Sequence, residues 1–449
     1  MIDMEMNITD KFVETLYTLH SRPMTPELML EARRCVYDEI ACFYAGLPIQ
    51  KERINAYLDC FEGNDATVFG LGRKASLQNA ALCNAIIAHT CDFDDGHRFS
   101  TVHLASTTII PLLAVCEKED LSMEDFLRGV VIGYETGIRL GRCVQPAHRA
   151  RGFHSTGTCG TIGAAMAVAS ALNFTKEQFK AALSAACTSA AGCNEMMENI
   201  SNMKPFNAGR ASHDGITAAY IAKSGFNGPY DVMWGTFGWL RNACETFDEK
   251  VLTLDFDDNY NIFGCYHKPY AACRHVHAAV YASIKAAEQQ SIDYKDVEKI
   301  DIRMYGQGIK GHNYTDIPSP AAGKMSAPYC IALALKTGDV GINSFTEENV
   351  KDEEIIALTK KVTVTENPEF TAMVPKKRAA EATITLKDGS TSYFKADYAP
   401  GEPEIPLTIE DFRAKLLGSS TLTAEENAAI EDYILNGNGK VRELIALLK

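Results

Sequence analysis

The sequence predicts a mainly α-helical protein with a smaller α+β part, and two observations support this prediction. From the start of the chain to about residue 245, apolar residues recur at three- and four-residue spacing, as in helices that bury one face. After about residue 295, apolar and polar residues alternate, as in half-buried strands, before helical spacing returns in the tail. We therefore expect an all-helical domain of residues 1–265 and 406–449, and an α+β domain of residues 266–405.

The helical regions begin at residues that can cap a first turn. The expected starts are Thr25 before Pro26, Ser122 with Asp125, Thr175 with Gln178, and Thr408 and Thr423 in the tail. The segment GTCGTIGAAMAVASALN, residues 157–173, is apolar nearly all round and rich in Ala and Gly. Such a helix is expected at the centre of its domain, with other helices packed closely against it.

The α+β part is predicted from three alternating segments. VEKIDIRMYG begins at residue 297 and KKVTVTENPEF at residue 360, and both have the alternation of strands. EATITLKDGSTSYFKA is expected to form a hairpin, because Asp388-Gly389 favours the tight turns that join antiparallel strands. A helical segment, SAPYCIALALKTG, lies between these strands, and PGEPEIP, residues 400–406, marks the boundary before the tail.

Composition excludes several classes of function. The chain has 46% hydrophobic and 23% charged residues and a formal net charge of -14, which disfavours nucleic acid and anionic membrane as partners. A small anionic substrate would need a local cluster of Lys and Arg. We find no membrane-span pattern and no signal-peptide core in MIDMEMNITDKF. The 14 cysteines include no CxxC spacing, so we expect a cytoplasmic protein with neither disulfides nor a zinc site.

The strongest signal for chemistry is HTCDFDDGHRFSTVH, which runs from His89 to His103 between two helical segments. It contains three aspartates and three histidines in fifteen positions. Acid–base groups crowded between core elements are costly to bury, so they usually mark a site. A solvated acidic loop with incidental histidines is the structural alternative.

Four further segments contain imidazoles, and three of them also contain Lys or Arg. They are RLGRCVQPAHRARGFHSTGTCG with Arg149 and His154, KPFNAGRASHDG with Lys204 and His213, HKPYAACRHVHAAV with Arg274 and His277, and GHNYTD with His312. Imidazole is the usual general acid or base near neutral pH, and Lys and Arg bind carboxylates. Together the clusters predict proton-transfer chemistry on a small polyanion. For any single one of these histidines or lysines, a packing or solvated role remains the alternative.

Three other chemistries fit less well. VFGLGRKASLQNAAL contains a G-x-G-x-x-A run, but no second strand and no βαβ series follows it, as dinucleotide binding requires. The aspartates and histidines of residues 89–103 could bind a divalent metal, yet their spacing matches no EF-hand or HExxH pattern. There is no G-x-S-x-G elbow and no activating motif beside a cysteine, which disfavours a covalent hydrolase.

Four stretches together resemble the MmgE/PrpD family, which includes 2-methylcitrate dehydratase, cis-aconitate decarboxylase and iminodisuccinate epimerase. They are NAIIAHTCDFDDGH with His103 after it, RGFHSTGTCGTIGAA, KPFNAGRASHDGITAAYIAKSGFNGP and KPYAACRHVHAAV, and the resemblance covers nearly the whole chain. It implies a large helical domain with a smaller α+β lid domain, a homodimer, and an active site in the cleft between the domains. It implies no metal and no other cofactor.

The resemblance also implies site residues. Those carried over as catalytic are Asp92, His103, His154, Lys204 and His277. The further substrate-binding candidates are His97, Arg149, His213 and Arg274. The chain departs from the family pattern at Leu104, where proline is usual, and at Arg149 and His213. Extra cationic groups at Arg149, His213 and Arg274 leave the exact substrate open.

We therefore expect a cofactor-independent lyase that acts by proton abstraction on a small di- or tricarboxylate, with a 2-methylcitrate-type dehydratase as the first interpretation. Decarboxylation of the cis-aconitate type and epimerisation of the iminodisuccinate type use the same machinery and remain alternatives. Lys204 and Arg274 would hold carboxylates, and His103 or His154 would move the proton. A non-catalytic polycarboxylate-binding protein is the alternative from a different class.

Overall fold

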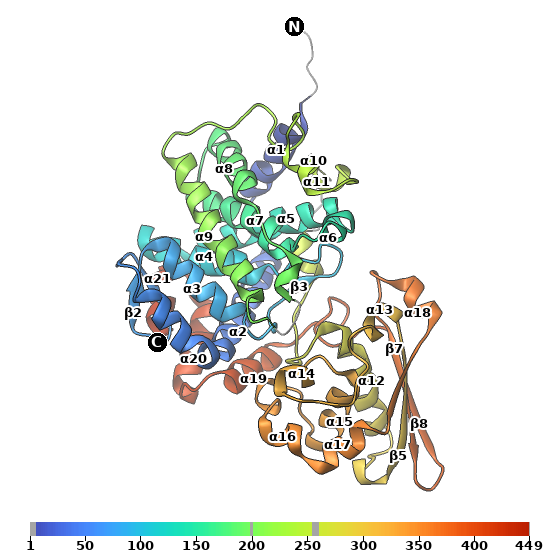
Figure 1. Cartoon of the computed structure of the whole chain (residues 1–449). Coiled ribbons are helices and arrows are strands. Elements are labelled where there is room, and N and C mark those ends of the chain that lie inside the picture. Colours follow the sequence, from blue (N-terminus) through green and yellow to red (C-terminus); the bar gives the residue numbers. More distant parts are fainter. Residues whose placement is uncertain (1–5, 198–200, 254–259, 449) are drawn as a thin grey trace. The chain divides into compact units, whose positions relative to one another are not determined.

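The computed structural model of this chain describes residues 6–197, 201–253 and 260–448. The chain divides into two compact units, one made of residues 1–265 and 420–449 and the other of residues 266–419 (Figure 1). The first unit is almost entirely helical, and the second combines helices with a four-stranded sheet. The predicted fold class, mainly α with an α+β part, is confirmed.

The first unit contains long helices joined by short connections. Its helices are α1 (Ile8–Ser21), α2 (Pro26–Leu58), α3 (Leu77–His89), α4 (Ala105–Glu119), α5 (Met123–Val144), α6 (Ala147–Ala150), α7 (Ser155–Ala171), α8 (Lys176–Ser189), α9 (Lys204–Lys223), α10 (Trp239–Ala243), α11 (Lys250–Thr253), α20 (Ala424–Asn436) and α21 (Val441–Leu447). Short 3-10 turns lie at Asn194–Met197 and Asn261–Gly264, and β3 is Gly96–His97.

Helix α7 is the centre of this unit, as its composition predicted. Every residue of α7 is buried, and α4, α5, α8 and α9 pack around it (Figure 1). The glycines make these close approaches possible. A Cβ on Gly160 would stand 2.9 Å from the Thr107 side chain of α4, and one on Gly163 would stand 3.0 Å from the Gly133 carbonyl of α5. Small residues therefore set the distance between α7 and its neighbours.

The predicted caps are confirmed. The hydroxyls of Thr25, Ser122, Thr175 and Thr423 accept backbone N–H bonds in the first turns of α2, α5, α8 and α20. Thr408 likewise accepts from the N–H of Asp411 at 3.2 Å, at the start of α19 (Ile409–Ser419). Each bond satisfies a donor that the helix itself cannot pair.

The second unit is built on a sheet with strand order β6-β5-β7-β8. Strands β5 (Val297–Met304) and β6 (Val362–Glu366) are parallel, and β7 (Ala380–Leu386) pairs antiparallel with both β5 and β8 (Thr391–Ala396). Asp388-Gly389 turns the β7–β8 hairpin as predicted, with Gly389 at φ 88°. Helix α12 (His277–Glu288) packs on β7 and β8, and α15 (Ala327–Thr337) packs on α12. The shorter elements are α13 (Gly306–Ile309), α14 (Pro320–Gly323), α16 (Glu347–Lys351), α17 (Glu353–Thr359), α18 (Pro368–Met373) and the 3-10 turns Arg274–Val276, Tyr294–Asp296 and Ile342–Ser344. Strand β4 (Cys265–Tyr266) lies where the sequence passes from the first unit to the second.

Two details differ from the sequence prediction. A small hairpin of β1 (Ala66–Val68) and β2 (Arg73–Ala75) interrupts the helices of the first unit. It was not predicted, because strands of three residues are too short to show alternation. Residues 406–419 were expected with the helical domain, yet α19 belongs to the second unit. Its Phe412 ring packs edge-on against His267 with 5.1 Å between ring centroids, and the Gly418 carbonyl accepts a hydrogen bond from Asn343.

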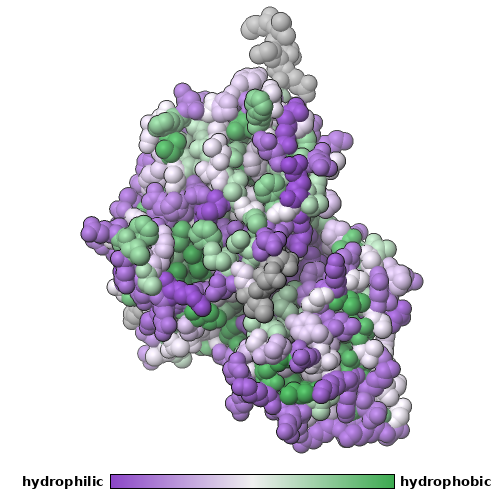
Figure 2. Space-filling view, in the orientation of Figure 1, coloured by the Kyte–Doolittle hydropathy of each residue, from purple (hydrophilic) through white to green (hydrophobic). Residues whose placement is uncertain are grey.

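Among the residues that the structure describes, no helix has both the length and the apolar composition needed to cross a membrane. On the face shown in Figure 2, hydrophilic side chains are interspersed with hydrophobic patches.

Candidate active site

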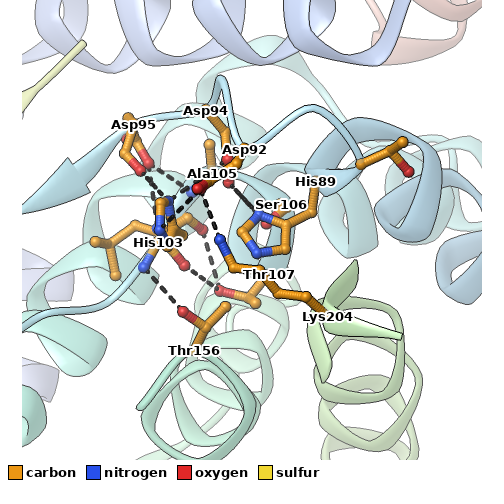
Figure 3. A network of polar contacts seen from close by, with 12 residues as sticks. His89, Asp92, Asp94, Asp95, His103, Ala105, Ser106, Thr107, Thr156 and Lys204 are labelled. Carbon is orange, nitrogen blue, oxygen red and sulfur yellow. Dashed lines mark hydrogen bonds and ion pairs between the residues drawn. The ribbon is translucent and has the colours of Figure 1, made fainter. Parts of the chain in front are cut away.

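The three aspartates of the DFDD segment follow α3 directly and serve three different purposes. Helix α3 ends at His89, and Asp92 then adopts a left-handed conformation with φ 50°, which aspartate tolerates better than most residues. This turn leads into a segment in which Asp94 and Asp95 are fully buried and Asp92 is partly exposed. Figure 3 shows the resulting network, in which side chains of α3, α4, α7 and α9 meet around the three carboxylates.

Asp92 forms an ion pair with Lys204, the cation of the site. Its Oδ1 lies 2.7 Å from Lys204 Nζ and 3.5 Å from His103 Nε2. Lys204 is the first residue of α9, where the following Pro205 fits because the first turn of a helix needs no N–H there. The side chains of Lys204 and His103 keep 20% and 15% of their surface exposed, so a small molecule can reach both.

Asp94 contacts two imidazoles of the site. Its Oδ2 accepts from His89 Nδ1 at 2.8 Å and from the Ser106 hydroxyl at 3.3 Å, and its Oδ1 lies 3.5 Å from His103 Nδ1. The rings of His89 and His103 are in contact, with 4.8 Å between their centroids. A fully buried carboxylate is stable only with such partners, so Asp94 fixes the two rings relative to each other.

Asp95 ties the segment to the helices behind it. Its Oδ1 accepts the backbone N–H groups of Leu104 and Ala105 at 3.2 and 3.1 Å, which caps α4, and its Oδ2 accepts the Tyr134 hydroxyl at 2.6 Å. The Asp95 carbonyl accepts the Nδ1–H of His103 at 2.7 Å. With Nδ1 occupied by this bond, His103 presents Nε2 to the space beside Asp92 and Lys204.

His154 completes the cluster from the residue before α7. It is 5% exposed, and its Nδ1 lies 3.0 Å from Asn207 Nδ2 of α9. Burial, and then the positive charge of Lys204, hold the pKa of His154 well below its ordinary value of 6.5, while Asp92 acts in the opposite direction. His154 is therefore neutral near pH 7. Four of the five predicted catalytic residues, namely Asp92, His103, His154 and Lys204, thus come together in the first unit.

The same cluster contains donors that could hold a metal ion. His89, Asp94 and His103 each offer one ligand atom, and these atoms lie within 4.8 Å of one another. However, Nδ1 of each ring already donates to an oxygen within 2.8 Å. The geometry is that of a hydrogen-bonded network. That the site works without a metal stays a prediction, which activity after chelator treatment tests.

The other candidates of the first unit lie in different surroundings. His97 is buried in the turn after the DFDD segment, where its Nδ1 accepts the N–H of Ser100 at 3.2 Å. Arg149 is exposed on the short helix α6. His213 lies nine residues after Lys204 along α9, about 13 Å at the usual helical rise, and its ring pairs with Asp214 at 2.9 Å. Substrate binding by these three residues stays a prediction.

His277 and Arg274 belong to the second unit. His277 begins α12 and donates from Nε2 to the Ala272 carbonyl at 3.0 Å, and burial together with the charge of Lys268 lowers its pKa to about 3. Arg274 is 8% exposed, stacks on the Tyr266 ring at 4.0 Å and forms an ion pair with Glu402. Its Nε and Nη1 have no hydrogen-bond partner among the described residues. Catalytic and carboxylate-binding roles for His277 and Arg274 also stay predictions.

Sequence reasoning did not assign His89, Asp94 or Asn207 to the site. For Asn207 a signal was present, because it lies three residues after Lys204 and so on the same face of a helix. His89 and Asp94 were part of the recognised cluster, but the pairing of their side chains depends on the turn at Asp92, and the sequence does not specify that turn.

The structure is that of a two-domain, mainly helical protein with a buried Asp–His network in its helical unit. Comparison with known proteins identifies the family that has this organisation. A family model of the MmgE/PrpD N-terminal domain matches residues 10–251, and one of the MmgE/PrpD C-terminal domain matches residues 270–436. The chain therefore belongs to the MmgE/PrpD family, as the sequence motifs indicated.

Curated relatives are similar along nearly their whole length. The chain is 24% identical over 475 residues to a cis-aconitate decarboxylase-like protein of Aspergillus oryzae, covering 99% of this chain and 98% of that protein. It is 23% identical over 470 residues to the cis-aconitate decarboxylase of Aspergillus terreus, covering 98% and 95%. The human cis-aconitate decarboxylase is 24% identical over 441 residues, covering 92% and 88%.

Proposed function

We propose that this protein is a cofactor-independent decarboxylase of a small unsaturated tricarboxylate of the cis-aconitate type. The observation that carries the choice of reaction is that the relatives are named for cis-aconitate decarboxylation. The geometry is compatible with it, because His103 presents Nε2 beside the Lys204–Asp92 pair. The sequence alone favoured dehydration of 2-methylcitrate, and the relatives favour the alternative reaction instead.

Lys204 supplies the positive charge that a carboxylate needs in a protein of net charge -14. Asp92 already forms an ion pair with Lys204 at 2.7 Å. A substrate carboxylate therefore either shares Lys204 with Asp92 or replaces Asp92 as its partner. Both arrangements keep the ammonium group fixed before the substrate arrives. A fixed cation stabilises negative charge at lower cost than water, which must reorient.

His103 is the proton donor in this proposal. Asp95 holds Nδ1, and Asp92 lies 3.5 Å from Nε2, where its negative charge favours a positively charged ring. When CO₂ leaves, the carboxylate–carbon bond breaks and its electron pair forms a new double bond. The pair of the old double bond moves to the carbon beside a remaining carboxylate, and that carbon takes the proton from His103 Nε2. Lys204 neutralises the charge that collects on that carboxylate.

The test is incubation of purified, chelator-treated protein with cis-aconitate, 2-methylcitrate and iminodisuccinate in separate reactions. We expect CO₂ to be released from cis-aconitate in a one-to-one ratio with the new product seen by proton NMR, and little change in the other two. Loss of water from 2-methylcitrate without CO₂ release would restore the dehydratase interpretation. Thermal stabilisation by all three anions without any chemical change would support a binding protein.

The assembly and location of the protein remain predictions. The family resemblance implies a homodimer, which sedimentation at micromolar concentration can check. The cysteine pattern predicts a reducing cytoplasmic location.

A further inference from the structure

The side-chain amide of Asn207 has only one orientation that satisfies its neighbours. Asn207 is 4% exposed, one turn along α9 from Lys204. Its Nδ2 lies 3.4 Å from the Cys193 carbonyl and 3.0 Å from His154 Nδ1. A carbonyl oxygen can only accept a hydrogen bond, so the NH₂ group faces Cys193 and also donates to His154.

This orientation determines which nitrogen of His154 carries the proton. Because Nδ1 accepts from Asn207, Nδ1 has the lone pair, and the proton of the neutral ring is on Nε2. The structure shows no hydrogen-bond partner for Nε2 among the described residues. The charged groups that act on the ring are Lys204 of α9, His89 of α3, and His103 and Asp92 of the segment between α3 and α4. Three of these four disfavour a second proton.

His103 has the opposite arrangement. Its Nδ1 donates to the Asp95 carbonyl, so its Nε2 is the nitrogen that gains and loses a proton. The two imidazoles therefore differ in what they can do. His103 can exchange a proton at Nε2, whereas neutral His154 can only donate a hydrogen bond from Nε2 and keep its proton.

We infer that Asn207 is a positioning residue that holds His154 as a neutral hydrogen-bond donor, and that Nε2–H of His154 binds the substrate carboxylate oxygen on which negative charge collects. The inference rests on the proposed function and deepens it, because it separates proton transfer from charge stabilisation. No proton leaves His154 during the reaction. The electron pair of the broken bond forms the new double bond, and the pair of the old double bond is delocalised onto the remaining carboxylate. An oxygen of that carboxylate accepts the Nε2–H bond, and the proton that the carbon gains comes from His103.

The decisive variant is Asn207→Asp, which keeps size and shape but replaces the donor with an acceptor. Aspartate accepts from Nδ1–H, so the neutral ring of His154 then lacks the proton on Nε2. The doubly protonated ring still donates from Nε2. We expect kcat near the wild-type value at acidic pH, and a fall of about 10²–10³ as pH rises and His154 loses its Nε2 proton. In the wild type only the loss of the His103 proton lowers kcat as pH rises, so the variant adds a second titrating group that the wild-type profile lacks, and KM changes less than kcat.

A matched control is Asn427→Asp in α20. Asn427 is also 4% exposed, and its Nδ2 also donates to backbone carbonyls, those of Leu422 and Thr423 at 3.2 and 3.1 Å. This variant places the same buried carboxylate against carbonyl groups and the Ser420 hydroxyl, and no imidazole is among the hydrogen-bond partners that the structure describes for Asn427. We expect lower thermal stability and an unchanged shape of the pH profile. If Asn207→Asp gave the same profile as Asn427→Asp, the positioning role would be overturned.

A second measurement is independent of activity. In protein labelled with ¹⁵N-histidine, long-range ¹H–¹⁵N correlation spectra distinguish the two neutral tautomers from the charged ring, and the His154→Gln variant assigns the signals. We expect wild-type His154 to remain in the Nε2–H form at neutral and alkaline pH, and Asn207→Asp to make it titrate in that range. Wild-type His154 with a proton on Nδ1 would overturn the inference even if decarboxylation occurs. Absence of decarboxylation with the expected tautomer would contradict only the proposed function.

Discussion

Lys204 shows most directly how single residues act in this site. It shares Asp92 Oδ1 with His103, its charge lowers the pKa of His154, and its contact with Asp92 at 2.7 Å fixes the position of the ammonium group. Replacing it by methionine keeps the aliphatic stem and removes only the charge. We expect Lys204→Met to lower kcat/KM for cis-aconitate by about 10²–10³, since one preorganised charge is lost. Steady-state kinetics measures this, and circular dichroism checks the fold.

Lys223→Met provides the comparison within the same helix. Lys223 ends α9 and also contacts a carboxylate, Glu119, at 3.0 Å, but on the surface. Surface ion pairs contribute little, so this variant should keep wild-type kinetics. Equal losses in both variants would mean that α9, rather than the charge of Lys204, accounts for the effect.

The buried imidazole of His277 makes the stability of the protein depend on pH. Its pKa is about 3 in the folded protein, lowered first by burial, against an ordinary value of 6.5. Between these values the unfolded chain binds one more proton than the folded one. Stability is therefore fully retained above pH 6.5 and falls as pH decreases toward 3, by up to about 1.4 kcal/mol per pH unit from this group.

His277→Gln removes this titration and can still donate to the Ala272 carbonyl. Urea unfolding from pH 7.5 to pH 4.5 should therefore show a shallower loss of stability in the variant than in the wild type. Parallel curves for the two proteins would show that His277 is not the buried neutral ring described above.

The residues of the site were predictable to different degrees for physical reasons. Asp92, His103, His154 and Lys204 were assigned from the resemblance to the MmgE/PrpD family, and each lies in a segment whose residue types are unusual for a core. Asn207 was missed because a single buried amide is not unusual in a helix, and its importance comes from a contact with a residue 53 positions away. The sequence does not contain the distance between α7 and α9, on which that contact depends.

At the level of elements, local interactions were predicted and non-local ones were not. The caps at Thr25, Thr175 and Thr423 involve residues three positions apart, so the sequence contains the whole interaction. The membership of α19 in the second unit depends on Phe412 meeting His267, which lie far apart in the chain. Local sequence patterns therefore predict the helices and strands of this protein better than they predict which elements pack together.

Helix α9 offers a test of how closely the elements that carry the site are packed. A Cβ on Gly209 would stand 2.8 Å from the Leu82 carbonyl and 2.6 Å from the Ile86 side chain of α3. Because a backbone carbonyl cannot move aside alone, Gly209→Ala must separate α9 from α3. We expect a loss of about 1–3 kcal/mol in the free energy of unfolding, measured with urea, together with reduced activity.

Gly418→Ala is the control for added volume. Gly418 lies in α19, and no neighbouring atom lies within 4 Å of the position of its Cβ. The added methyl group should be neutral or slightly stabilising, because alanine favours helix more than glycine does. A Gly209→Ala protein as stable as wild type would show that α3 and α9 are not in close contact.

For the whole molecule, charge opposes the proposed substrate. The chain has 44 Lys and Arg residues against 58 Asp and Glu residues, so a tricarboxylate approaches a protein of its own sign. The repulsion acts over about 30 Å at 0.01 M salt and about 8 Å at 0.15 M. In the proposed complex, Lys204, His103 and His154 would contact the substrate directly, and salt screens such short contacts far less than the long-range repulsion.

We therefore expect kcat/KM for cis-aconitate to rise as salt increases from about 0.01 M to about 0.15 M, with kcat nearly constant. Screening weakens the long-range repulsion that slows encounter, while the bound substrate keeps its short-range contacts. Initial rates in KCl measure the effect, and the same series with a neutral co-solute in place of salt controls for viscosity. If kcat/KM fell with salt, a local positive potential would already dominate the approach to the site, and the overall negative charge would have no influence on substrate capture.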